Sequence, residues 1–229
     1  MIENNIASVR HRVQLASTNS HRNVDSVLIL AVSKTKPAED IATAYQLGLH
    51  DFGENYVQEL EAKSATLSDL NICWHFIGPL QSNKTATVAS IAHWVHSVDR
   101  LKIARRLSDQ RPENLEPLNV CIQVNIDREA TKSGVMPEDT LALALEIASL
   151  PNIKLRGLMV IPSAHVPASQ TKASFARAAK LLNELKGHPL LQSAPIDTLS
   201  MGMSSDLELA IEAGSTIVRV GSDLFGARN

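Results

Sequence analysis

Short apolar runs alternate with amphipathic stretches along this chain of 229 residues. Brief runs rich in valine, isoleucine and leucine, bounded by turn residues, indicate β-strands. The runs of this kind cover residues 27–32, 51–54, 74–78, 94–98, 118–126, 154–161, 196–201 and 216–220. The pattern therefore predicts eight strands.

Stretches with apolar residues at helical spacing separate these runs. They cover residues 38–48, 55–69, 83–92, 100–109, 137–149, 169–186 and 204–213. The first 20 residues also predict a helix, because Ile6, Val9, Val13 and Ala16 recur at intervals of three or four positions. Strands and helices are thus expected to alternate throughout the chain.

Turn and capping residues stand at the ends of these stretches. Gly48 and Gly214 follow helical patterns, where a glycine commonly ends a helix, and Pro37 stands at a boundary. Ser205 and Glu208 have the spacing of a capping box, which predicts that a helix begins near them. No long linker rich in proline, glycine or serine divides the chain, so we expect a single domain over residues 1–229.

An α/β chain with eight strands in strict alternation with helices is typical of the (β/α)8 or TIM barrel. The alternative is an open, doubly wound sheet. That fold needs a glycine-rich phosphate loop after its first strand, and the segment AVSKTKP (residues 31–37) contains no glycine. The sequence therefore predicts a TIM barrel.

The composition is that of an ordinary water-soluble protein, with 44% hydrophobic residues, 20% charged residues and a formal net charge of −2. No run of lysine and arginine indicates a nucleic-acid surface. The apolar runs are too short to cross a bilayer, and the N-terminus lacks the apolar stretch of a secretion signal. Cys73 and Cys121 lie in apolar runs, which favours reduced cysteines over a disulfide. We expect a cytoplasmic protein that binds neither nucleic acid nor membrane.

Residues with chemical potential follow several predicted strands. In a TIM barrel the active site lies in the loops after the carboxyl ends of the strands, and phosphate groups are commonly bound after strands seven and eight. The first predicted strand leads to Lys34 and the second to Asn55. The seventh leads to residues 200–205 and the eighth to residues 219–222, both of which contain glycine and serine.

Glycine and serine at these last two strand ends suit a phosphate group. Gly202 and Gly221 let the backbone approach an anion, and Ser204 and Ser222 supply hydroxyl and amide donors. A helix that begins near Ser205 directs the positive end of its dipole to the same place. The alternative is that these residues only cap helices. The same chemistry at two adjacent strand ends favours a phosphate site.

Lys34 shares strand parity with Leu30 and Val32, so its side chain points into the barrel if theirs do. An amine in a closed barrel mouth near the cation of Lys36 loses its proton more readily than in water, as an imine-forming lysine must. The pattern therefore indicates that Lys34 holds an aldehyde as a Schiff base. A lysine near a strand end can instead extend to water, which we expect of Lys36.

Arg219 distinguishes between cofactor chemistries. A guanidinium has no acceptor and keeps its proton, so beside a pyridine nitrogen it leaves that nitrogen unprotonated. Pyridoxal phosphate (PLP) is then a weaker electron sink than it is opposite an aspartate. The alternative interpretation of Arg219 is that it pairs with an acidic side chain at the barrel mouth.

The histidines do not predict a metal site. His93 and His96 resemble a metal-binding pair, but in a strand their side chains point to opposite faces. No cluster of carboxylates and histidines completes a site around them. We expect no bound metal, and we expect His75 to be a histidine of the core.

Several motifs, in order along the chain, resemble those of the pyridoxal phosphate homeostasis protein family. They include AVSKTKP (31–37), FGENYVQE (52–59), WHFIGPLQSNK (74–84), LSMGMSSDLELAIEAGST (199–216) and RVGSDLFGAR (219–228). The resemblance runs from the first predicted strand to the C-terminus, and WHFIGPLQSNK and SMGMSSD are the most specific motifs. It implies a PLP-binding barrel of fold type III, like the N-terminal domain of alanine racemase.

The resemblance also implies roles for particular residues. Lys34 forms the Schiff base with PLP, and Arg219 faces the pyridine nitrogen. The implied phosphate and ring contacts are Ser204, Gly221, Ser222, Asn55 and either Met201 or Met203. Ser222 stands where many relatives carry threonine, so the hydroxyl is kept.

The function implied is that of a PLP carrier in vitamin B6 homeostasis, with indirect effects on amino-acid and keto-acid balance, rather than that of an enzyme. Racemisation needs a base on each face of the α-carbon, and related racemases take the second from a tyrosine of a further β-rich domain. The chain leaves no room for this domain after the eighth strand, and Tyr45 and Tyr56 lie in helical stretches. The alternatives are a weak PLP-dependent racemase or lyase, and an aldolase that uses Lys34 on a sugar phosphate.

A PLP carrier needs proteins that receive the cofactor from it. We expect PLP-requiring apo-enzymes to receive the cofactor, with Lys36 and Lys132 as candidate acceptors during transfer. Because the domain that builds racemase dimers is lacking, we expect a monomer.

Overall fold

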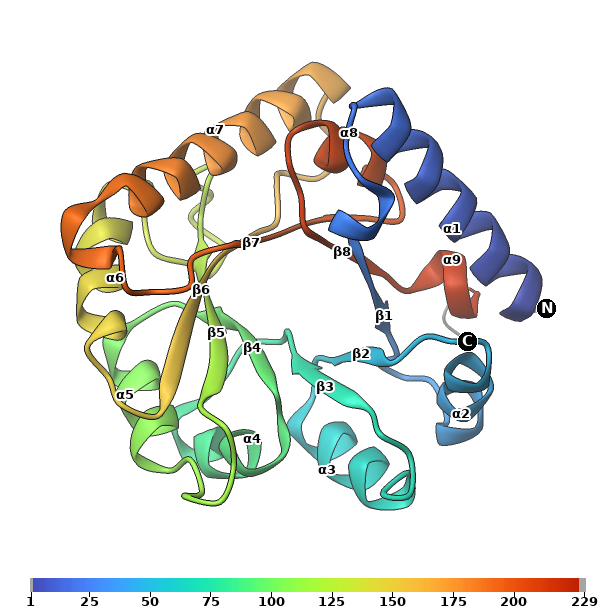
Figure 1. Ribbon diagram of the computed structural model, residues 1–229, viewed down its shortest axis with the longest axis horizontal. Coiled ribbons are helices and arrows are strands. Elements are labelled where there is room, and N and C mark those ends of the chain that lie inside the picture. The colour runs from blue at the N-terminus through green and yellow to red at the C-terminus, as the bar shows by residue number, and fades with distance from the viewer. Residues whose placement is uncertain (1, 227–229) are drawn as a thin grey trace.

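The structure is a computed structural model that describes residues 2–226. Eight parallel strands form one closed barrel in chain order, because β8 pairs with β1 as well as with β7 (Figure 1). The strands are β1 Leu28–Val32, β2 Asp51–Glu54, β3 Cys73–Phe76, β4 Trp94–Val98, β5 Leu118–Val124, β6 Ile153–Val160, β7 Thr198–Met203 and β8 Ile217–Val220. The predicted (β/α)8 TIM barrel is confirmed.

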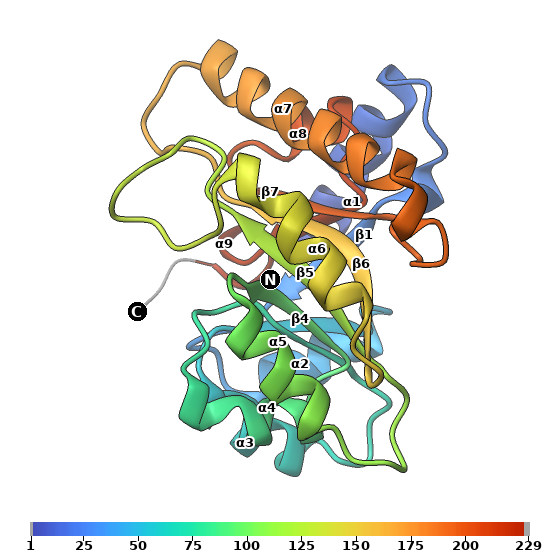
Figure 2. The same cartoon turned by 90° about the vertical axis from the view of Figure 1, so that its left-hand side faces the viewer.

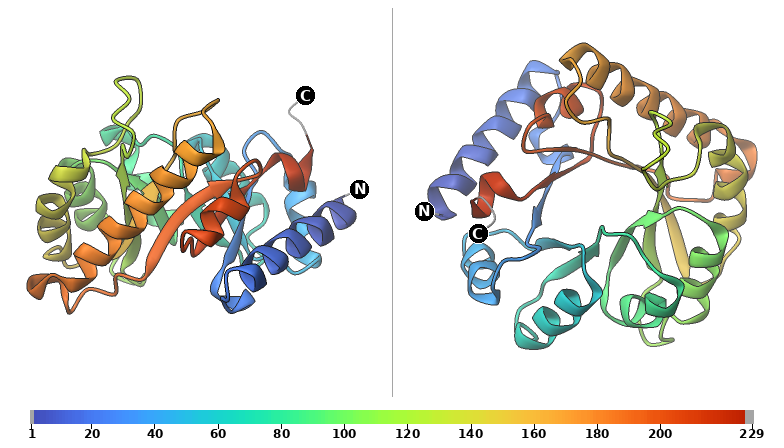
Figure 3. Two further views of the ribbon diagram at one scale, coloured as in Figure 1. Left: turned by 90° about the horizontal axis from the view of Figure 1, so that it is seen from above. Right: turned by 180° about the vertical axis from the view of Figure 1, so that it is seen from behind.

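A helix follows each strand and packs on the outside of the barrel (Figures 1 and 3). The helices are α1 Ile2–Asn19, α2 Ala38–Gln46, α3 Val57–Thr66, α4 Thr85–Ile91, α5 Leu101–Asp109, α6 Thr140–Ala148, α7 Ala168–Gly187, α8 Leu207–Glu212 and α9 Ser222–Phe225. Short 3-10 turns occupy Val24–Ser26, Ser82–Lys84, Pro137–Asp139 and Pro189–Leu191. In the side view, α6 and α7 lie outside β5 and β6 (Figure 2).

The element boundaries differ from the predicted ones by one to three residues at many ends; α3, for example, covers Val57–Thr66 where residues 55–69 were predicted. Strand β7 begins and ends two residues later than predicted, at Thr198 and Met203. Ser205 and Glu208 do not form a capping box. The N-cap of α8 is Asp206, whose Oδ1 accepts a hydrogen bond from the Met203 amide at 2.7 Å. Glu208 is instead paired with Arg12 of α1, a contact that local spacing cannot predict.

The barrel has an apolar outer layer and a polar interior. Phe52 and Phe76 are fully buried in the core between the strands and the helices. His96 of β4 lies 2.8 Å from Ser200 of β7, and because these two strands are not neighbours, the contact crosses the interior of the barrel. Branched apolar side chains usually fill this space, so the polar interior calls for an explanation.

Helix α1 joins the first part of the chain to the last. It lies beside α8 and α9 (Figure 1). The Asn5 side-chain amide donates to the carbonyl of Leu224 at 3.0 Å, and Arg12 forms ion pairs with Glu208 and Asp223. Within residues 2–226, no helix combines the length and the apolar character needed to span a bilayer.

Gly157 of β6 provides a test of the barrel packing. Its φ of +152° is unfavourable for a residue with a side chain, and an added Cβ would lie 1.8 Å from the carbonyl oxygen of Thr198. We expect Gly157→Ala to lower the free energy of unfolding by about 3 kcal/mol or more, measured by chemical denaturation. Gly187→Ala is the control, since a Cβ there meets nothing within 4 Å. Equal stability of the two variants would contradict the close approach of Gly157 to the carbonyl oxygen of Thr198.

Candidate functional site

A cavity of about 350 Å³ lies at the carboxyl ends of the strands, where TIM barrels place their active sites. Its walls come mainly from residues at or after the ends of β1, β2, β7 and β8. Larger hollows of about 690 and 800 Å³ lie on the helical surface and at the opposite end of the barrel, and neither is lined by Lys34 or Arg219.

The cavity brings together most of the residues predicted to bind a cofactor. Those that line it are Lys34, Asn55, Met203, Ser204, Arg219, Gly221 and Ser222. The strand register explains this gathering, because Arg219 of β8 pairs with Leu30 of β1 on one side and with Met203 of β7 on the other. Met201 does not line the cavity. It is fully buried in the hydrophobic core, so of the two methionines only Met203 can contact a ligand there.

The turn after β1 holds Lys34 at the cavity wall in a strained conformation. Thr35 has a φ of +63°, which is rare for a β-branched residue. Two hydrogen bonds hold this turn: the Thr35 amide donates to Glu59 at 2.8 Å, and the Lys36 amide donates to the carbonyl of Ser33 at 3.0 Å. The direction of the chain at Lys34 is therefore fixed by its neighbours on both sides.

A buried ionic cluster, which the sequence did not predict, supports the same turn. The Lys63 amine of α3 donates to the carbonyl of Ser33 at 2.8 Å and to the carboxylates of Glu54 and Glu59 at 2.8 and 2.6 Å. The Ser33 hydroxyl also donates to Glu54 at 2.6 Å. Burial raises the pKa of Glu54, while Lys63 and Ser33 act in the opposite direction. Loss of one partner of a buried ion pair costs several kcal/mol, so this cluster anchors β1 and β2 next to Lys34.

The opposite wall of the cavity carries two hydroxyl groups. The Ser222 hydroxyl donates to that of Ser204 at 3.1 Å, so the loop after β7 meets the start of α9. Arg12 donates to the carbonyl of Ser204 at 2.8 Å and pairs with Asp223, which holds both loops from behind. An added Cβ at Gly221 would lie 3.2 Å from the carbonyl oxygen of Val32, so glycine allows close approach there.

Arg219 enters the cavity wall from β8 and is 5% exposed. Its Nη1 donates to the carbonyl and the hydroxyl of Ser200 at 2.6 and 2.9 Å, and its Nη2 donates to the carbonyl of Val160 at 2.9 Å. Burial lowers the pKa of Arg219 to about 10, so the group remains a cation at neutral pH. No carboxylate forms a described ion pair with it; its fixed partners are neutral oxygens.

The donor set of the cavity fits an anionic aromatic aldehyde such as PLP. Its described walls include three cations, Lys34, Lys36 and Arg219, and no carboxylate. The buried Oδ1 of Asn55 has no hydrogen-bond partner, which leaves a polar atom at the cavity for a ligand to satisfy. The hydroxyl groups of Ser204 and Ser222 suit a phosphate.

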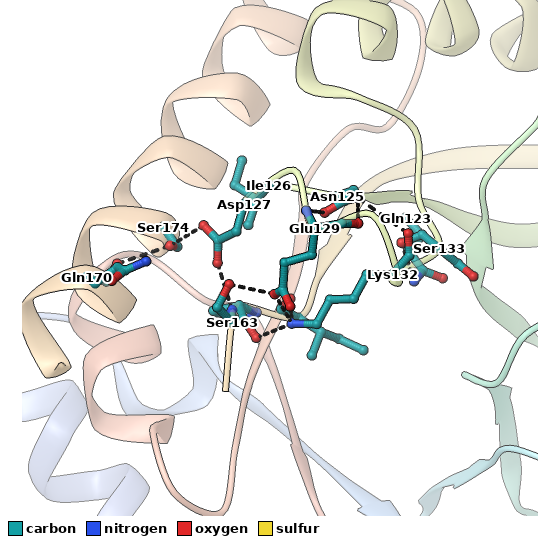
Figure 4. A network of polar contacts seen from close by, with 12 residues as sticks. Gln123, Asn125, Ile126, Asp127, Glu129, Lys132, Ser133, Ser163, Gln170 and Ser174 are labelled. Carbon is teal, nitrogen blue, oxygen red and sulfur yellow. Dashed lines mark hydrogen bonds and ion pairs between the residues drawn. The ribbon is translucent and has the colours of Figure 1, made fainter. Parts of the chain in front are cut away.

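A polar network holds the loops that follow β5 and β6 (Figure 4). The Lys132 amine donates to the carbonyl of Pro162 at 2.7 Å and pairs with Glu129 at 2.7 Å. Asn125 binds the backbone of Glu129, and the Ser163 hydroxyl donates to the Glu129 carboxylate. Lys132 does not line the cavity, whereas Lys36 does. The two lysines predicted as acceptors therefore have different surroundings.

His93 lies just before β4 rather than in it, and His75 is a core histidine as predicted. His93 is exposed, whereas His96 and His75 are fully buried. Burial lowers the pKa of both His75 and His96, so both rings are neutral at neutral pH. The only group of described residues that could offer three ligands to a metal is Asp51, Cys73 and His75, whose ligand atoms lie within 4.8 Å of one another. The spacing of these three residues along the chain does not by itself predict the cluster.

Comparisons with known proteins agree with this geometry. The model of the alanine racemase N-terminal domain family matches residues 5–229. An alanine racemase from Corynebacterium glutamicum superimposes with a TM-score of 0.69 at 14% identity, over 96% of this chain and 61% of that chain, which shows a common fold alone. The fold and the site thus define an alanine racemase N-terminal-like barrel.

Relatives with higher sequence identity identify the family within this class. A pyridoxal phosphate homeostasis protein from Pseudomonas aeruginosa is 54% identical over 228 residues, which cover 100% of this chain and 96% of that protein. The protein of the same name from Escherichia coli is 48% identical over 100% of this chain and 97% of its own length. The chain therefore belongs to the pyridoxal phosphate homeostasis protein family.

PipY from Synechococcus elongatus is a solved structure that is similar to this chain. The structure with PLP bound has a TM-score of 0.84 and 38% identity, over 99% of this chain and 100% of that chain. The structure without PLP has a TM-score of 0.86 and 39% identity over the same shares.

The buried histidines predict a pH dependence of stability. A histidine whose pKa is lowered by folding binds its proton more readily when unfolded, so stability is lost as the pH falls below the unfolded value of about 6.5. Between pH 7 and pH 5 we expect His96, whose pKa lies well below its usual value, to contribute a loss of up to about 2 kcal/mol, measured by urea denaturation. His75 should contribute a smaller loss, because Asp51 opposes the shift of its pKa. His96→Gln should reduce this slope, whereas the exposed His11→Gln should leave it unchanged. An equal slope in all three proteins would refute the assignment.

Proposed function

We propose that this protein binds PLP through Lys34 and takes part in the intracellular homeostasis of that cofactor. The observation that carries the proposal is the convergence on one cavity of an amine, a buried guanidinium and a pair of serine hydroxyls, from β1, β8 and the loop after β7. The PLP-bound structure of the similar PipY supports this assignment.

When bound, PLP supplies an aldehyde that a lysine amine captures as a Schiff base with the loss of water. Lys34 is positioned for this role because its turn is fixed by Thr35 and by the cluster around Lys63. Ser204 and Ser222 would donate hydrogen bonds to the phosphate group, and Lys36 adds a positive charge to the same cavity. The unpartnered Oδ1 of Asn55 would accept a hydrogen bond from a donor of the ligand.

Arg219 argues for a carrier rather than a catalyst. It donates hydrogen bonds but cannot accept one, so it favours an unprotonated pyridine nitrogen and weakens the electron sink that carbanion chemistry requires. Its side chain is held by Ser200 and Val160, so its charge stays in place when the cavity is filled.

A second catalytic base is the feature that a racemase would need. The described cavity walls contain no tyrosine. Tyr45 of α2 packs edge-on against His50, and Tyr56 is 54% exposed. The name of the relatives, homeostasis protein, agrees with a role other than catalysis. The alternative function is a PLP-dependent racemase or lyase of low activity.

The proposal includes the transfer of PLP from this protein to apo-enzymes. Lys36 lines the cavity and is the better placed of the two candidate acceptors. The amine of Lys132 is engaged by Glu129 and by backbone carbonyls, and its described role is to hold the loop after β6. A monomeric state and a cytoplasmic location stay predictions.

Borohydride trapping tests the cofactor site. We expect the PLP-loaded protein to absorb visible light, and its reduced adduct to map to Lys34 by peptide mass spectrometry. Lys34→Ala should abolish the adduct, whereas Lys36→Ala should retain it, because the proposal assigns the Schiff base to Lys34 and only a role in transfer to Lys36. A protein that PLP cannot reconstitute, or an adduct at another lysine, would refute the proposal.

Isotope exchange separates a carrier from an enzyme. A carrier without a second base should not exchange the α-hydrogen of an amino acid. We expect PLP-loaded protein in deuterium oxide to exchange the α-hydrogen of L-alanine no faster than free PLP does at the same concentration, measured by proton NMR. Exchange above that level that is lost in Lys34→Ala would establish the racemase or lyase alternative.

A further inference from the structure

A row of polar side chains runs through the interior of the barrel and ends at Arg219. His75 Nε2 lies 3.0 Å from Asp51 Oδ1, and His75 Nδ1 lies 2.9 Å from His96 Nε2. His96 Nδ1 lies 2.8 Å from Ser200 Oγ, which accepts from Arg219 Nη1 at 2.9 Å. Asp51 stands at the start of β2 and borders the hollow at the amino-terminal end of the barrel, so the row spans from that end to the cavity.

The carboxylate of Asp51 fixes the direction of every hydrogen bond in the row. An ionised carboxylate can only accept, so His75 carries its proton on Nε2 and donates it to Asp51. Because both rings are neutral, His75 Nδ1 accepts from His96 Nε2, and His96 Nδ1 is left to accept from the Ser200 hydroxyl. Arg219 can only donate, and it donates to a lone pair of Ser200 Oγ. Each inner group thus donates one bond and accepts one.

The inner members of this row are buried, which keeps their hydrogen bonds in one arrangement. His75, His96 and Ser200 are 0% exposed, so water does not compete for their bonds. The His75 ring is also stacked on Trp94, with 5.5 Å between centroids and 2° between planes, which fixes its orientation. In a low-dielectric interior, hydrogen bonds in a chain strengthen one another, and a missing member leaves a costly unpaired group.

Hydrogen bonding also accounts for the cluster of Asp51, Cys73 and His75. The His75 Nε2 proton is shared with Asp51, and the thiol of Cys73 lies 3.4 Å from the same nitrogen. Burial raises the pKa of Cys73, so in this network the side chain is a neutral thiol. The chain to Arg219 explains these contacts without a metal ion.

We propose that Asp51, His75, His96 and Ser200 are positioning residues that form one directed hydrogen-bond chain and thereby hold Arg219 as a fixed donor at the cavity wall. The proposal rests on the proposed function in one respect, namely that Arg219 faces the bound PLP ring. In this arrangement the carboxylate of Asp51 at the far end of the barrel directs the Ser200 proton to His96, so the lone pairs of Ser200 Oγ are oriented to Arg219.

Histidine tautomers in the ligand-free protein test the direction of the chain. Long-range proton–nitrogen NMR spectra should show His75 and His96 both protonated at Nε2 only. Asp51→Ala should release this preference at His75, whereas Asp51→Asn should retain it, since the amide oxygen still accepts. A wild-type spectrum with the proton of His96 on Nδ1 would overturn the proposal.

The PLP-loaded protein tests the effect on Arg219. We expect Ser200→Ala to shift the visible absorption maximum and to speed PLP release roughly tenfold, because a bond to a charged donor is lost. Ser97→Ala is the matched control, since Ser97 is an equally buried serine on β4 whose hydroxyl has no hydrogen-bond partner. Asp51→Ala should cause a smaller shift in the same direction, and Asp51→Asn should restore the wild-type spectrum.

These outcomes separate the two proposals. If Ser200→Ala matches the wild type and Ser97→Ala in spectrum and release rate, the positioning role is refuted while the PLP site stands. If the wild-type protein takes up no PLP, the proposed function fails, and the tautomers of the ligand-free protein still decide whether the directed chain exists.

Discussion

The pairing of β8 with β1 closes the barrel, and the geometry of the cavity depends on that closure. It places Arg219 beside Leu30, and it brings the start of α9 next to the turn that carries Lys34. Gly221 makes the approach possible, because a Cβ there would lie 3.2 Å from the carbonyl oxygen of Val32. An amine, a guanidinium and a pair of serine hydroxyls thus come together from residues that are remote in the sequence.

Charged side chains of the surrounding helices hold the backbone of the loops that form the cavity. Lys63 supports the backbone of Ser33 from α3, and Arg12 supports Ser204 from α1. Such buried or half-buried ionic contacts add little net stability, since desolvation offsets much of their attraction. They do fix geometry, which is what a site that binds and releases the same cofactor requires.

Much of the fold and part of the site could be predicted from the sequence. The position of Lys34 just after the first strand predicted its place at the cavity, because TIM barrels build their sites at the carboxyl ends of the strands. Met201 and Met203 have the same strand parity, so the choice between them depends on the register shift of β7 between Ser200 and Met203. The contacts of Arg12, Lys63 and the row from Asp51 to Arg219 could not be predicted, since each joins residues whose proximity only the closed barrel creates.

The contacts of helix α1 have a consequence for how the protein is made. Arg12 is separated from Asp223 by 211 positions, yet it holds the loop that carries Ser204 at the cavity. Chains emerge from the ribosome N-terminus first, and contacts between distant residues form late because their loop-closure entropy must be overcome. Helix α1 is therefore synthesised long before its partners in α8 and α9, and the cavity is complete only after β8 has been made.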